Sequence, residues 1–367
     1  MVTEQAAAPV RPRAELRTFH PGWFAAIMGT GIVAVAAFIN PGNLPILQSP
    51  LRLLGVGLAW LTYAITVAVG VPYGLRWLRH PAAAWQDFRH PVVGALYGTL
   101  PGGILVLAVV TATVGPAVVP SGLVFRLVAG LALVGGALAF AVSVGSAYVL
   151  FVHPQVGAET VNGGWFIPLV VNIIVPLALM PLVPAVGPET GRLLLVASWA
   201  AWGAGFLMFL LVASLLYGRL IHHPLPAAPL APSLWIGLGP IGVGGLALMR
   251  LAQVGAPHLG ELGATVNGLA ALGALALWGF GLWWLAISAL LLARYVRNGG
   301  LPFGMGWWAF TFPLGAYTVD TLTLARTWQV PILEGLGAAF FVMLVGFWLL
   351  VAARILRGML TGETWQR

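Results

Sequence analysis

Residues 122–152 read GLVFRLVAGLALVGGALAFAVSVGSAYVLFV, a run in which Arg126 is the only charged side chain. About 20 apolar residues are enough for a helix to cross a bilayer. The apolar residues of this run do not alternate with polar ones, as they would in a membrane β-barrel. A helix also pairs all of its backbone polar groups within one segment, as hydrocarbon requires. The run therefore predicts a transmembrane α-helix.

The rest of the chain has the same character. Of 367 residues, 60% are hydrophobic and 7% are charged, and the mean hydropathy is +0.97. A soluble domain is about 25% charged. Nine more apolar segments lie at approximately 22–40, 51–72, 92–114, 165–186, 192–217, 234–254, 264–292, 305–325 and 330–356. The predicted fold class is an all-α membrane protein with ten transmembrane helices.

Arginine placement predicts the orientation. All 17 basic residues are Arg, and twelve of them fall on the side of the membrane that would hold both termini. Positive residues favour the cytoplasm, so we expect a multi-pass protein of the cell (inner) membrane with both termini cytoplasmic. Residues 1–20 form the predicted N-terminal tail, 21–357 the ten-helix domain and 358–367 the C-terminal tail. Residues 1–18 lack an apolar core and a cleavage site, so no removable signal peptide is expected.

An internal repeat indicates how the helices are arranged. The second span ends in the sequence RWLRHP at residues 76–81, and the sixth ends in RLIHHP at residues 219–224. Similar endings recur about once per helical hairpin along the chain. Five hairpins with like faces predict a quasi-five-fold arrangement around a central pore, and internal repeats are common in transport proteins.

Prolines distinguish the odd-numbered spans from the even-numbered ones. A proline inside a helix frees a backbone carbonyl, which hydrocarbon tolerates only against protein or a water-filled cavity. The odd spans carry these prolines: Pro101, Pro168, Pro176, Pro240 and Pro313. The even spans are smoother and bulkier. We therefore expect odd spans inside and even spans facing lipid, although Pro and Gly in membrane helices can also simply permit close packing.

Ionisable side chains within the predicted spans are few. Asp320 is placed near the outer end of the ninth span, and Glu159 and Glu334 are interfacial or in loops. The lack of an acid at mid-membrane argues against cation transport and permits a neutral or anionic substrate. Polar residues that could line a pore are Thr30, Thr99, Asn172 and Thr311. Each could instead form a helix–helix hydrogen bond.

The sequence gives little indication of metal binding or nucleic-acid binding. There are no cysteines. The histidines cluster at span ends without the spacing of convergent ligands. We expect no metal site, no cofactor and no catalytic residue, and we assign the basic residues to membrane topology instead of nucleic acid.

Three motifs give a family resemblance. Residues 19–32 read FHPGWFAAIMGTGI, residues 235–242 read WIGLGPIG and residues 307–315 read WWAFTFPLG. They resemble the first, seventh and ninth spans of the tellurite-resistance/dicarboxylate transporter family, which includes slow-type anion channels, malate permeases and sulfite efflux pumps. The resemblance covers the whole chain in span number and order. It implies ten helices in five hairpins around a central pore, assembled as a homotrimer.

The resemblance also implies a gate. In the channel branch of that family a phenylalanine on the ninth span plugs the pore, and the matching position here is Phe312, with Phe310 as the second choice. Predicted pore-lining residues, from the motifs and from the polar and proline positions above, are Met28, Gly29, Thr30, Gly31, Thr99, Pro101, Asn172, Pro176, Gly239, Pro240, Thr311 and Pro313.

The expected function is transport of a small anion, a C4-dicarboxylate such as malate or else sulfite, through a pore in each protomer. The expected partners are this anion and the lipid bilayer. A passive halide or nitrate channel is the alternative. An intramembrane enzyme or sensor is disfavoured because the spans offer no convergent catalytic groups.

Overall fold

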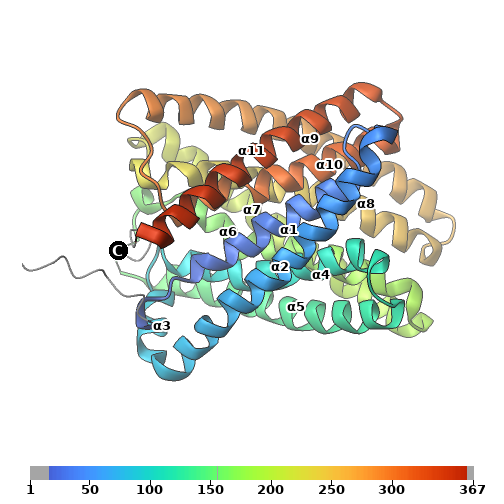
Figure 1. Ribbon diagram of the computed structural model, residues 1–367, viewed down its shortest axis with the longest axis horizontal. Coiled ribbons are helices and arrows are strands. Elements are labelled where there is room, and N and C mark those ends of the chain that lie inside the picture. The colour runs from blue at the N-terminus through green and yellow to red at the C-terminus, as the bar shows by residue number, and fades with distance from the viewer. Residues whose placement is uncertain (1–15, 155, 362–367) are drawn as a thin grey trace, which may run out of the picture.

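The computed structural model describes residues 16–154 and 156–361, and this part of the chain is built from helices without any strand (Figure 1). The long helices are α1 (Phe24–Phe38), α2 (Pro45–Arg79), α4 (Thr99–Val114), α5 (Ser121–Val152), α6 (Ile167–Leu179), α7 (Pro188–His222), α8 (Leu238–Gly255), α9 (Leu262–Arg297), α10 (Phe312–Trp328) and α11 (Pro331–Thr361). A short helix, α3 (Pro81–Phe88), follows α2. The expectations for residues 1–15 and 362–367 lie outside the described residues, and α11 runs past the predicted domain boundary at residue 357.

Helices occupy all ten predicted segments, but the segments differ in length. In the described part of the chain, nine helical segments are long and apolar enough to cross a membrane. The remaining helix, α10, has 17 residues and carries Asp320 and Arg326. An α-helix rises about 1.5 Å per residue, so α10 by itself is shorter than the hydrocarbon core of a bilayer, about 30 Å. Helices α1, α4 and α6 are shorter still, with 13–16 residues, but adjoining 3-10 turns lengthen their segments to 18–24 residues.

Burial separates the helices into an inner and an outer set. The segments that contain α1, α4, α6 and α8 are 61–89% buried within the protein, whereas those of α2, α5, α7, α9 and α11 are 17–28% buried. Most of α10 is buried as well. The prediction that odd spans lie inside and even spans outside is therefore confirmed.

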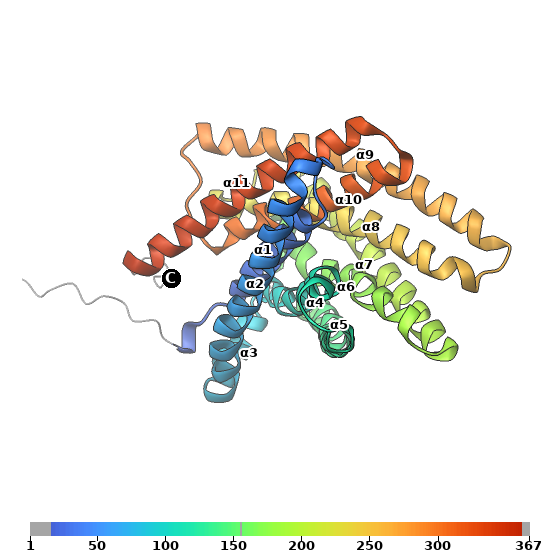
Figure 2. The ribbon, with the colours of Figure 1, turned by 45° about the vertical axis from the view of Figure 1, so that its right-hand side comes forward.

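The inner helices contact one another in a closed series. Helix α1 packs against α4, α4 against α6, α6 against α8, α8 against α10, and α10 against α1. Each inner helix also packs against the outer helix that follows it, which gives the hairpins α1–α2, α4–α5, α6–α7, α8–α9 and α10–α11. Figure 2 shows α4–α5, α6–α7 and α8–α9 as successive pairs around the bundle.

The prolines act differently from the prediction. Pro101, Pro168, Pro240 and Pro313 do not break their helices but lie in the first turn of α4, α6, α8 and α10. The first backbone N–H groups of a helix have no partner within it, so proline removes nothing there. Only Pro176 lies inside an inner helix. Outer helix α2 contains Pro50 and Pro72, so internal prolines are not confined to inner helices.

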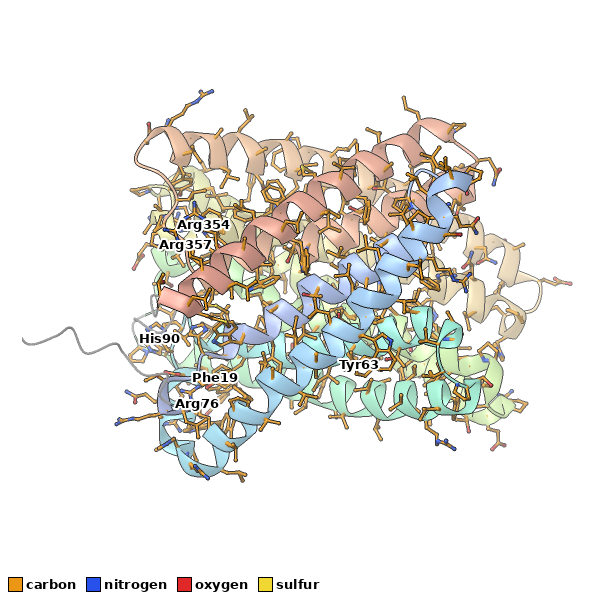
Figure 3. All side chains as sticks on the ribbon, viewed as in Figure 1. Phe19, Tyr63, Arg76, His90, Arg354 and Arg357 are labelled. Carbon is orange, nitrogen blue, oxygen red and sulfur yellow. The ribbon has the colours of Figure 1, made fainter. Side chains whose placement is uncertain are left out.

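The first and last described residues lie at the same end of the bundle (Figure 1). Figure 3 labels Arg76, His90, Arg354 and Arg357 at this end. Two of the arginines expected at the membrane surface are instead buried. Arg76 is 1% exposed and forms an ion pair with Asp87 of α3. Arg219 donates hydrogen bonds to the carbonyl oxygens of Glu159 and Pro224.

Candidate functional site

Each inner helix is entered through a short 3-10 helix. These are η2 (Pro21–Trp23), η3 (Gly94–Gly98), η6 (Gly163–Phe166), η8 (Ala228–Gly237) and η10 (Met305–Phe310). Residues from all five of these entry regions line one cavity. The N-termini of the five inner helices therefore converge on a common space. The repeat seen in the sequence corresponds to this unit, a 3-10 turn followed by an inner and an outer helix.

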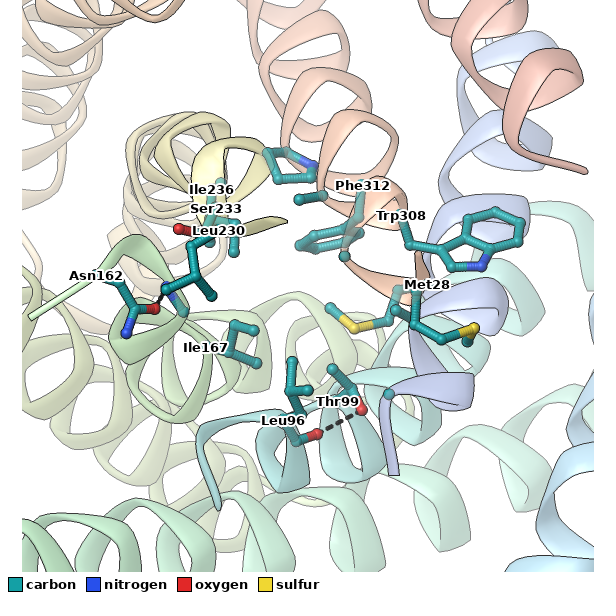
Figure 4. A pocket seen from close by; sticks show the side chains of 18 of the residues that line it. Met28, Leu96, Thr99, Asn162, Ile167, Leu230, Ser233, Ile236, Trp308 and Phe312 are labelled. Carbon is teal, nitrogen blue, oxygen red and sulfur yellow. Dashed lines mark hydrogen bonds between the residues drawn. The ribbon is translucent and has the colours of Figure 1, made fainter. Parts of the chain in front are cut away.

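The cavity has a volume of about 340 Å³ and a mainly apolar wall. Figure 4 shows Met28, Ile167, Ile236 and Phe312 around it, each from a different inner helix or its entry turn. None of the residues that line it is Asp, Glu, Arg or Lys, and His20 is the only titratable side chain among them. The cavity is thus electrically neutral when His20 is neutral.

Besides His20, the polar side chains of Ser233, Asn162 and Thr99 reach the cavity in different hydrogen-bonding states. The hydroxyl of Ser233 accepts from the backbone N–H of Gly163 at 3.2 Å, and among the described residues its own proton has no acceptor. Asn162 accepts from Gly164 and donates to the carbonyl of Thr160. Thr99 uses its proton on the backbone carbonyls of Leu96 and Pro21. Ser233 is therefore a free donor for a bound anion, and Thr99 is not.

Helix N-termini make such a cavity favourable for anions. The aligned peptide dipoles of an α-helix place about half a positive charge at its N-terminus. The first N–H groups of α1, α4, α6 and α8 already bond to carbonyls of their 3-10 entry turns, so the helix dipoles, and not free N–H donors, would act on an anion here. Five N-termini around one neutral cavity give a positive potential without a fixed cation. The arrangement suits a small anion that must be bound weakly enough to leave again.

Comparison with known proteins identifies the family. The family model described as voltage-dependent anion channel matches residues 18–356. The chain belongs to the voltage-dependent anion channel family. This match confirms the resemblance found in the sequence, and it agrees with a cavity that favours anions.

Relatives in this family include transporters. An uncharacterized transporter from Methanocaldococcus jannaschii is 32% identical over 352 residues, 96% of this chain and 96% of the relative. A sulfite efflux pump from Trichophyton rubrum is 29% identical over 367 residues, 95% of this chain and 94% of the relative. The family and the names of these relatives support anion transport and point to a transporter or channel, not an enzyme.

The two residues predicted as gates of this anion channel family protein occupy different environments in the structure. Phe312, the first residue of α10, lines the cavity and is 7% exposed. Phe310, the last residue of η10, does not line it. Its ring centroid lies 5.7 Å from that of Trp235 and 5.2 Å from that of Phe347 on outer helix α11. Phe312 faces the cavity, whereas Phe310 packs the entry turn against Trp235 and Phe347.

The other predicted lining residues divide in the same way. Met28, Thr99, Gly239 and Pro313 line the cavity. The rest do not: Gly29, Thr30, Gly31, Pro101, Asn172, Pro176, Pro240 and Thr311. The hydroxyl oxygen of Thr30 accepts a hydrogen bond from the Trp348 indole at 3.1 Å, which ties α1 to α11. The amide of Asn172 donates to Pro168, and the side chain packs against Gly205 of α7.

Sequence reasoning missed several residues that line the cavity. Ser233, Asn162, Leu96 and Ile236 all belong to the 3-10 entry turns or lie just before them. The repeat could have located them, because each lies within a few residues of the aromatic or glycine position that opens an odd span. The search for polar residues within the apolar runs could not, because Asn162 and Ser233 lie just before predicted spans, and Leu96 and Ile236 are apolar.

The structure buries one acidic side chain that the sequence analysis placed near the outer end of its span. Asp320 lies at the middle of α10 and is 0% exposed. Neither of its carboxyl oxygens has a hydrogen-bond partner among the described residues. The sequence estimate placed it near the outer end because the ninth span was drawn to include η10, which moved the apparent centre toward the N-terminus.

Proposed function

We propose that this protein transports a small anion, sulfite or a C4-dicarboxylate such as malate, through a central pore in each protomer. The observation that carries the proposal is the convergence of five helix N-termini on one neutral cavity. The contacts that run from α1 through α4, α6, α8 and α10 back to α1 support a quasi-five-fold ring around that pore. In this arrangement all ten long helices cross the bilayer, with η10 extending α10.

The proposed orientation has both termini in the cytoplasm of the cell (inner) membrane. The first and last described residues lie at one end of the bundle, together with Arg76, Arg354 and Arg357 (Figure 3). Arginine favours the cytoplasmic side. The cavity lies at the N-terminal ends of the inner helices and so opens toward the cytoplasm. A homotrimer, with one pore in each protomer, is proposed from the family resemblance.

Sulfite is the first substrate to test, because a relative that covers nearly the whole chain is named a sulfite efflux pump. Malate carries two negative charges near neutral pH, whereas sulfite is partly present as the singly charged hydrogensulfite, which a wall without fixed cations accommodates better. The same neutral wall also favours the second candidate, a passive halide or nitrate channel, since dipoles and hydroxyls discriminate little among small anions.

The test is flux of labelled sulfite, malate and chloride into liposomes that contain the purified protein, with and without a pH gradient. We expect sulfite to enter faster than into protein-free liposomes. Gly239→Met extends a side chain into the cavity and is expected to reduce the flux. Gly57→Met, at an exposed position of α2 with no neighbouring atom within 4 Å, is the matched control. If none of the three anions moves faster than in empty liposomes, the proposal is wrong.

A further inference from the structure

Asp320 is the one fully buried acidic side chain in the described part of the protein. Its two carboxyl oxygens are shielded from solvent and have no hydrogen-bond partner there. An ionised carboxylate without a partner is very unfavourable inside a protein or a membrane. Asp320 therefore carries a proton in this closed arrangement. Ionisable side chains within membrane helices are rare and most often functional.

A row of glycines on α8 makes room for this carboxyl group. Gly239, Gly242 and Gly245 follow one another at intervals of three residues along the side of α8 that faces α10. At Gly242 an added Cβ would lie 2.6 Å from the backbone nitrogen of Tyr317, so the two helices touch there. At Gly245 an added Cβ would lie 3.0 Å from each carboxyl oxygen of Asp320. The carboxyl group fills the seam between two neighbouring helices of the inner ring.

The charged side chains on and around α10 interact with residues other than Asp320. The helices packed against it are α1, α8, α9 and α11. Arg326 near the end of α10 pairs with Glu334 of α11 at 2.8 Å, and Arg250 of α8 is exposed and bonds to Gln253. The nearest ionisable neighbour on α10 is Tyr317, whose hydroxyl donates to the carbonyl of Trp278 on α9. No described cation is positioned to neutralise an ionised Asp320.

The position of Asp320 along α10 relates it to the cavity. It follows Phe312 by eight residues, which is about 12 Å along a helix. Eight residues at 100° each also bring it to within about 80° of the direction of Phe312 around the helix. Asp320 does not itself line the cavity; it lies in the α8–α10 seam, about two helical turns beyond Phe312.

We propose that Asp320 is a proton-binding site of the anion path, which must hold its proton for an anion to pass. This inference rests on the proposed function. The proton binds to one carboxyl oxygen and makes the seam neutral. When the proton leaves, a negative charge appears in a low-dielectric wall with no cation beside it, and it repels the permeating anion. Anion flux then rises as the pH falls.

The experiment measures chloride flux into liposomes at equal internal and external pH, between pH 5 and pH 8. Chloride is the probe because, unlike sulfite and malate, it does not change charge over this range. For the wild type we expect flux to rise about tenfold from pH 8 to pH 5, the effect of repulsion between two like charges about 12 Å apart at an effective dielectric constant of about 20. Asp320→Asn keeps the shape without the charge. Its flux at pH 8 is expected to equal that of the wild type at pH 5, and to be flat with pH.

His20→Gln is the matched control, because His20 is the titratable side chain that lines the cavity. This variant is expected to keep the pH dependence. If Asp320→Asn does not fold, Asp320→Thr is used in its place. Threonine fits this part of α10, because the hydroxyl groups of Thr318 and Thr321 donate to backbone carbonyls one turn earlier. A pH response that survives in the neutral variant, or wild-type chloride flux that is flat with pH, overturns the inference alone. Absence of any anion flux in the wild type overturns the proposed function first.

Discussion

Replacing Phe312 with alanine is expected to raise anion flux by about 10- to 100-fold. Phe312 is 7% exposed and lines the cavity as the first residue of α10. With Phe312 as the proposed gate, opening requires its ring to leave this packed position. Burial of a phenylalanine side chain stabilises by about 1.5–3 kcal/mol, and each 1.4 kcal/mol is a factor of ten in an equilibrium. Without the ring, opening the pore no longer costs the free energy of unpacking it, so the fraction of open protein rises by the same factor.

The assay is chloride or sulfite efflux from liposomes with matched amounts of folded protein, followed with time after dilution. The control is Phe310→Ala. Phe310 is buried to a similar degree but stacks on Phe347 outside the cavity. Both variants lose stability, by about 3 kcal/mol for a well-packed phenylalanine, but only Phe312→Ala opens the path. Equal flux in the wild type and a folded Phe312→Ala protein would remove Phe312 as the gate. A similar rise in flux in both variants would indicate that loosened packing, and not loss of a gate, causes the effect.

Two other changes test the cavity and the ring. Ser233→Ala removes a hydroxyl donor that is free to reach an anion. We expect the flux to fall by about two- to tenfold, the value of one hydrogen bond. Thr99→Val is the control: the Thr99 hydroxyl already donates to the backbone, so this variant should change the flux less than twofold. Gly242→Ala places a methyl group against the backbone of α10 and should destabilise the protein by about 1–3 kcal/mol in thermal unfolding. Gly268→Ala, with no atom within 4 Å on α9, should be neutral or stabilising, and equal losses for the two would contradict close α8–α10 packing.

The sequence was sufficient for the helices and for their inner or outer position. Long apolar runs require helices in lipid, and glycines that permit close packing mark the helices that touch other helices on all sides. The interpretation of the prolines failed on a local point. Pro101 and Pro240 lie at the third position of their helices, because a 3-10 turn precedes each α-helix within the same apolar run. Composition does not distinguish these two helix types.

The direction of individual side chains was much harder to predict. Phe310 and Phe312 are two residues apart, yet the 3-10 helix ends at one and the α-helix begins at the other, so they face different neighbours. Thr30 and Asn172 point toward α11 and α7 because of the rotation of α1 and α6 about their axes. This rotation is fixed by contacts between helices far apart in the sequence. It is not determined by the residues of one span.

The distribution of charge along the path gives separate roles to the cavity and to Asp320. The favourable potential of a helix N-terminus is confined to about its first turn. It therefore acts on an anion in the cavity beside Phe312 and has faded at Asp320, two turns farther along α10. In that section neither helix dipoles nor a described cation offsets a negative wall charge. A single proton on Asp320 consequently changes the barrier there far more than the same charge would at the cavity, where five N-termini would compensate it.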